Sequence, residues 1–207
     1  MRTHLEPARH PTHYFHFERL KGHALPGSRY EFVLLCAELA VRTERVGILP
    51  YVVAEWTEQL ALAFAEYRKS PDHPFIQSKC LMYAGFVAHY AQEVCQPLNL
   101  KVHWNGRIGP DGASARTIVH EHVDSLIQDL NLDSDDLARD LKVEPFDDLM
   151  AGIWQQVEAG HALVDRVYQL EERLPSAAEK GSEPVPEVVD FAVERAREAV
   201  RFTAALY

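Results

Sequence analysis

Apolar side chains recur every three or four residues along most of this chain, a spacing that places them on one face of an α-helix. Proline, glycine, serine and aspartate separate the periodic stretches and mark helix starts and stops. The pattern predicts helices over residues 28–46, 50–70, 74–96, 114–130 and 145–174, a short acidic helix from 133, and a last helix over 184–205. No strand-like alternation and no internal repeat occurs, so we expect an all-α protein built as an irregular multi-helix bundle.

Composition is that of an ordinary globular domain. The chain has 207 residues, of which 47% are hydrophobic and 25% charged, enough for one all-helical domain over residues 1–207. Twenty-one basic and 31 acidic residues give a net charge of −10, which repels a polyanion, so we expect no duplex nucleic-acid partner. Cys36, Cys80 and Cys95 lie in apolar stretches without paired spacing and are predicted to be core residues.

Neither a membrane span nor a signal peptide is visible in the sequence. No window approaches eighteen uninterrupted apolar residues, and the first twenty residues contain no continuous apolar segment. We therefore expect no membrane span and, for the chain as given, a cytoplasmic location.

Candidate chemistry is concentrated in histidines that lie near carboxylates. His89 and Glu93 are four residues apart on one predicted helix, and His120 and Asp124 repeat this spacing on the next. Residues at i and i+4 leave the same face of a helix, and zinc accepts imidazole and carboxylate ligands together. One such pair is expected by chance, but two on successive helices, joined by a glycine-rich loop that contains His103, indicate a metal site.

Five short segments also resemble those of a known family. The sequence GFVAHYAQEVCQPLN, ending at Asn99, has a histidine, three residues, an acid and then Gln-Pro-Leu. HWNGR from His103 and RTIVHEHVD ending at Asp124 follow it, HYFHFE from His13 precedes it, and GILPY lies between. Over about residues 11–130 the chain resembles the zinc-dependent phospholipase C and single-strand-specific nuclease superfamily, in the manner of a divergent bacterial member.

The resemblance implies a fold, a ligand set and an activity. It implies that His13, His89 and Glu93 bind one zinc ion, and that His120 and Asp124 belong to a second ligand set. In that family the helix carboxylate bridges metal ions that bind phosphate oxygens and polarise a water for attack on a phosphodiester. The expected function is thus metal-dependent hydrolysis of a phosphoester or related small molecule, with Glu93 and Asp124 as catalytic residues.

The chain departs from the family at several ligand positions, which lowers the number of metal ligands expected. Glu93 stands where the family has aspartate, Asn99 where it has a histidine ligand, and His16 where it has an acid. The family's amino-terminal tryptophan and histidine ligands have no counterpart, because the chain starts too late. One zinc ion, or two held loosely, is what the remaining ligands predict.

Further residues are predicted to line the substrate pocket. The C-terminal helices over 131–207 are predicted to pack on the segment 11–130 that carries the family resemblance. Arg107 and Arg116 flank the expected site and suit an anionic substrate. The complete set of predicted pocket residues is His16, Asn99, His103, Trp104, Arg107, Arg116 and His122.

The sequence lacks the motifs of several other enzyme classes. The chain has no Gly-x-Ser-x-Gly nucleophile elbow and no phosphate-binding glycine loop that ends in Lys-Ser/Thr. Only one Glu-x-x-His occurs, at 158–161, whereas a di-iron bundle needs two. Two alternatives remain open: a non-hydrolytic descendant that binds a small molecule or a partner, and a metal-free enzyme that uses its histidines as acid and base.

Overall fold

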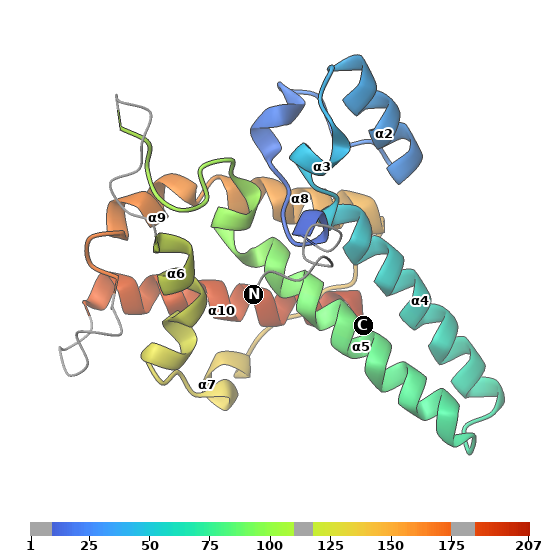
Figure 1. Ribbon diagram of the computed structural model, residues 1–207. Helices are drawn as coiled ribbons and strands as arrows, with labels where there is room; N and C mark the ends of the chain where they lie inside the picture. Colours follow the sequence, from blue (N-terminus) through green and yellow to red (C-terminus); the bar gives the residue numbers. More distant parts are fainter. Residues whose placement is uncertain (1–9, 110–117, 175–184) are drawn as a thin grey trace, which may run out of the picture.

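The computed structural model describes residues 10–109, 118–174 and 185–207, which form helices and no strand (Figure 1). The all-α class is therefore confirmed. The α-helices are α2 (Arg29–Glu38), α3 (Thr43–Val46), α4 (Leu49–Lys69), α5 (Pro74–Cys95), α6 (Val119–Asp129), α7 (Ser134–Ala138), α8 (Leu149–His161), α9 (Val164–Leu170) and α10 (Pro186–Leu206). Short 3-10 turns are η1 (His10–Thr12), η2 (Phe17–Leu20) and η3 (Pro97–Leu100).

Helices α4 and α5 form a long antiparallel hairpin, and α8 and α10 pack against α5 (Figure 1). Both hairpin helices begin close to the prolines that predicted them, since proline suits the first turn of a helix. Burial differs between the two halves of α5. Phe75 is 79% and Leu81 76% exposed, whereas Val87, Ala91 and Val94 are completely buried.

The predicted helix over residues 28–46 is broken. It begins as expected after Ser28, whose hydroxyl accepts a hydrogen bond from the Glu31 backbone N–H. It ends at Glu38, because Ala40 adopts a left-handed conformation with φ 53° and the Val41 N–H bonds back to the carbonyl of Cys36. The apolar periodicity continues through α3 and so hides this break.

The predicted helix over residues 145–174 is also divided, into α8 and α9. At the break the Leu163 N–H bonds to the carbonyl of Gly160 at 3.1 Å, a tight turn that redirects the chain. Gly160 lies so close to η3 that a Cβ there would stand 2.7 Å from Leu100 Cδ1. The expected linker over 176–183 and the expected start of the fourth helix at 114 lie outside the described residues.

Buried side chains form two hydrophobic clusters. One includes Phe15, Phe32 and Phe202 and joins α2, α4, α5, α8 and the end of α10. The other includes Leu98 and Phe191 and joins η3, α6, α9 and the start of α10. The end of α5 and η3 lie between the two clusters, and the candidate site is built there. The three cysteines are buried and unpaired, as predicted.

None of the helices in the described ranges combines the length and the apolar character that a membrane crossing requires.

Candidate metal centre

The segment that precedes η2 lies against α5 because backbone hydrogen bonds attach it on both sides. The Phe15 N–H donates to the carbonyl of Asn99 at 2.8 Å, and the His16 N–H donates to the carbonyl of Val46 at 2.6 Å. Phe15 itself is completely buried. These anchors bring His13 beside the C-terminal half of α5, where its ring centroid lies 5.2 Å from that of His89.

Gly47 makes this attachment possible. It has φ 91°, a conformation that favours glycine, and a Cβ placed on it would stand 2.0 Å from the carbonyl oxygen of Tyr14. The backbone of residue 47 therefore touches the backbone of the segment that carries His13. No other residue type fits there without displacing the segment.

His13, His89 and Glu93 form the cluster that the resemblance implied for one metal ion. Each offers one ligand atom, and these atoms lie within 4.8 Å of one another. His89 Nε2 is 3.6 Å from Glu93 Oε1, and Thr12 Oγ1 lies 2.9 Å from His13 Nδ1. Because zinc bonds are about 2.0–2.2 Å long, a small inward movement places all three atoms around one ion. Two imidazoles and a carboxylate, of which His13 and Glu93 also contact neighbouring side chains, thus form a set that could hold one metal ion.

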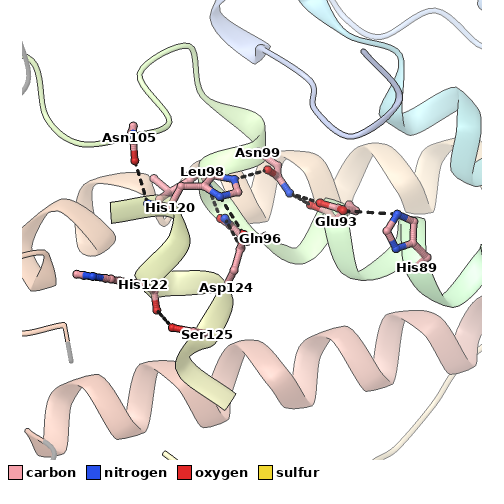
Figure 2. A network of polar contacts seen from close by, with 10 residues as sticks. All are labelled: His89, Glu93, Gln96, Leu98, Asn99, Asn105, His120, His122, Asp124 and Ser125. Atoms are coloured by element: carbon pink, nitrogen blue, oxygen red, sulfur yellow. Dashed lines mark hydrogen bonds and ion pairs between the residues drawn. The ribbon is translucent and has the colours of Figure 1, made fainter. Parts of the chain in front are cut away.

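Asn99 connects this cluster to the second predicted ligand pair (Figure 2). Its side chain is almost completely buried, and its Nδ2 donates to Glu93 Oε2 at 2.6 Å and to the backbone carbonyl of Glu93 at 3.1 Å. Since a backbone carbonyl can only accept, the amide orientation is unambiguous. Asn99 Oδ1 therefore faces His120 Nε2, at 2.7 Å.

Both ring nitrogens of His120 are engaged. Asn99 Oδ1 lies at one, and Asp124 Oδ2 lies 2.9 Å from the other, Nδ1. Amide and carboxylate oxygens are acceptors, so both ring nitrogens of His120 face protein oxygens at hydrogen-bond distance. Asp124 Oδ1 is engaged as well, since it accepts from Gln96 Nε2 at 3.0 Å. The second predicted ligand pair is thus engaged by contacts within the protein, and among the described residues it belongs to no group of three ligand atoms that could hold a metal ion.

Electrostatics mark Glu93 as the unusual group of the site. Burial raises the pKa of Glu93 above its ordinary value, and the negative charge of Asp124 acts in the same direction. The charges of His13 and His89 and the hydrogen bond from Asn99 lower it but do not compensate. A carboxylate held at this cost is better accommodated when a cation lies beside it.

No family model, no curated protein and no solved structure matches this chain. The interpretation of the site therefore rests on its residues.

Two other predicted pocket residues, Trp104 and His122, lie close to His120. Trp104 packs edge-on against His120, with ring centroids 5.5 Å apart, and is 45% exposed. His122 is on α6 beside His120, but its ring points away from Asn99 (Figure 2).

The remaining predicted pocket residues are directed elsewhere. His16 stacks on Tyr14, and its Nδ1 lies 2.9 Å from the carbonyl of Arg45, on the side of α3. Arg107 lies over the ring of Tyr168, whose hydroxyl donates to the backbone carbonyl of His103. Arg116 is outside the described residues.

A pocket beside the cluster was missed by the sequence reasoning. It has a volume of about 370 Å³ and lies between the C-terminal half of α5, α6, α7 and α10. His89, Glu93 and Asp124 line it together with Phe191 and Arg195 of α10. The sequence signal was weak, because α10 carries only an amphipathic pattern and no motif.

Proposed function

We propose that this protein is a single-metal hydrolase of phosphoric esters, in which His13, His89 and Glu93 hold the ion. The observation that supports this most directly is the convergence of these three ligand atoms within 4.8 Å, from two segments far apart in the sequence. Their chemistry, two imidazoles and one carboxylate, is that of catalytic zinc sites. When bound, zinc supplies Lewis-acid activation of a phosphoryl oxygen and of water.

The residues around the cluster have separate tasks in this proposal. Asn99 holds Glu93 Oε2, so that Oε1 faces His89 and the metal position. Asp124 has a half-exposed side chain that lines the pocket, which suits it to accept a proton from water. Its orientation is held by His120 on one oxygen and Gln96 on the other.

Metal content of the purified protein after zinc dialysis tests the proposal. We expect about one zinc per chain in the wild type, and loss of the ion in His89→Ala, which removes a ligand. His120→Ala should keep the ion, because the ring of His120 is committed to Asn99 and Asp124. His73→Ala is the matched control, since His73 is an exposed histidine at the start of α5.

Hydrolysis of bis(4-nitrophenyl) phosphate and of 4-nitrophenyl phosphate gives the second measurement. We expect chelation to abolish activity and His89→Ala to lower kcat/KM by more than the roughly 10–100-fold that loss of a mere ligand-supporting contact causes. A folded wild type that remains empty after zinc dialysis would refute the proposal. So would hydrolysis that survives chelation, which would favour metal-free acid and base chemistry.

A further inference from the structure

The pocket between α5, α6, α7 and α10 has the size and lining of a small-molecule site. Its volume of about 370 Å³ lies in the lower part of the range of about 300–1,000 Å³ that is usual for such sites. Its walls are mostly apolar and include Leu126 and Ile127 of α6, Leu137 of α7 and Phe191 of α10. Helices α6 and α7 both contact α10, and Figure 1 shows them beside it.

Helix α10 leaves the space open because it presents alanines to it. Ala192, Ala196 and Ala199 line the pocket from one face of the helix. They alternate with Arg195 and Val200 on the same face. A larger side chain at any of the three alanine positions would occupy the volume, so the cavity depends on these small residues.

Arg195 is the only cation that α10 contributes to this lining. Its side chain is 17% exposed, and one Nη2 contact of 2.8 Å joins it to Glu194. Its Nε is buried and has no hydrogen-bond partner among the described residues. The buried Nε is shielded from the pocket as well, so an acceptor in the pocket would meet the Nη donors that the single Glu194 contact leaves over.

The pocket contains both acids and a cation, and these favour ligands of opposite charge. Both acids already contact polar groups of the protein, Glu93 through Asn99 and Asp124 through His120 and Gln96. Asp124 is also about half exposed, so water screens its charge more than that of Arg195. Arg195 is thus the charged donor of the pocket, and the complementary ligand group is an acceptor or an anion.

We propose that this pocket binds a compact apolar molecule with an anionic or acceptor group that pairs with Arg195. Because His89 and Glu93 line the same pocket, a ligand that also carries a phosphoester would present that ester to the metal cluster. This placement of the ester rests on the proposed function. The ester and the Arg195 partner would then be separate groups at different places on one molecule. The binding site itself is defined by α6, α10 and Arg195.

Two probes with one apolar body and opposite charges test the inference: naphthalene-1-sulfonate and 1-naphthylmethylammonium. Binding to full-length, zinc-free protein in EDTA is measured by calorimetry, so that neither metal nor hydrolysis contributes. We expect the sulfonate to bind more tightly than the ammonium. Arg195→Met should weaken sulfonate binding about tenfold or more, the usual effect of losing a charge-assisted hydrogen bond.

Arg166→Met is the matched control. Arg166 also pairs with Glu194, at 2.6 Å, but it does not line the pocket. It should leave sulfonate binding unchanged, whereas Ala196→Phe should abolish the binding of both probes. Ala199→Leu replaces Ala196→Phe if circular dichroism shows that the latter is unfolded.

Three results would overturn the inference: absence of binding by either probe, equal or tighter binding of the ammonium, or equal effects of Arg195→Met and Arg166→Met. None of them depends on zinc. Failure of this inference is thus distinguishable from failure of the proposed hydrolase, which is judged by metal content and ester cleavage.

Discussion

Replacing Asn99 by aspartate tests the hydrogen-bonded network at its centre. The substitution keeps the shape of the side chain but replaces the Nδ2 donor by an acceptor, next to the backbone carbonyl and Oε2 of Glu93. The lost bond to the carboxylate is worth about 1.5–3 kcal/mol and the bond to the carbonyl about 1 kcal/mol. We therefore expect Asn99→Asp to lower the free energy of unfolding by roughly 2.5–4 kcal/mol at pH 7.

The pH dependence separates this explanation from simple loss of packing. Protonation of the new carboxyl at low pH restores a donor toward Glu93, so the deficit of Asn99→Asp should shrink as the pH falls from 7 to 5. Asn99→Ala cannot regain a donor, and its deficit relative to wild type should change much less. Both variants also remove or alter the acceptor that faces His120.

Urea unfolding followed by tryptophan fluorescence, with EDTA present, is the assay. Gln128→Ala, an exposed position on α6, serves as control and should stay within about 0.5 kcal/mol of wild type. The reasoning is refuted if Asn99→Asp is as stable as the control, or if its deficit is the same at pH 5 as at pH 7.

Gly47→Ala should destabilise the protein by at least about 2 kcal/mol and lower zinc content, because its Cβ collides with the carbonyl of Tyr14 and displaces the segment that carries His13; Gly85→Ala, where a Cβ meets nothing within 4 Å, is the control. Partial burial raises the pKa of Glu18, but the nearby His161 ring and the hydrogen bond and charge of Lys101 outweigh it and lower the pKa to about 2. A lowered folded-state pKa stabilises the protein above the ordinary value of 4.5, and this contribution is lost as the pH falls from 4.5 through about 2. Because solvent screens the partly exposed carboxylate, this contribution to the free energy of unfolding amounts to about 2 kcal/mol. The acid unfolding of Glu18→Gln should lack this part of the pH dependence. An acid transition identical to that of the wild type would contradict the expectation.

Local geometry was predictable because it depends on neighbours in the chain. Prolines at the starts of α4 and α5, and the Ser28 cap of α2, marked real helix starts. The two His–acid pairs on α5 and α6 do meet in the structure, at 3.6 and 2.9 Å, because residues four apart share a helix face. The breaks at Ala40 and Gly160 escaped prediction, since apolar periodicity continues across them and only tertiary contacts select the turn.

The sequence by itself determined that this chain is helical and that His89 with Glu93, and His120 with Asp124, lie on common faces. Only the tertiary structure decided which of these groups meet. Backbone contacts of the segment around Phe15, made possible by Gly47, bring His13 to α5. Asn99, buried between the two pairs, bonds to both, so that one ligand set converges and the other is engaged by contacts within the protein. Packing of α10 across α5 and α6 creates the pocket around Arg195. These outcomes depend on distances between segments remote in the chain, which helical spacing cannot specify.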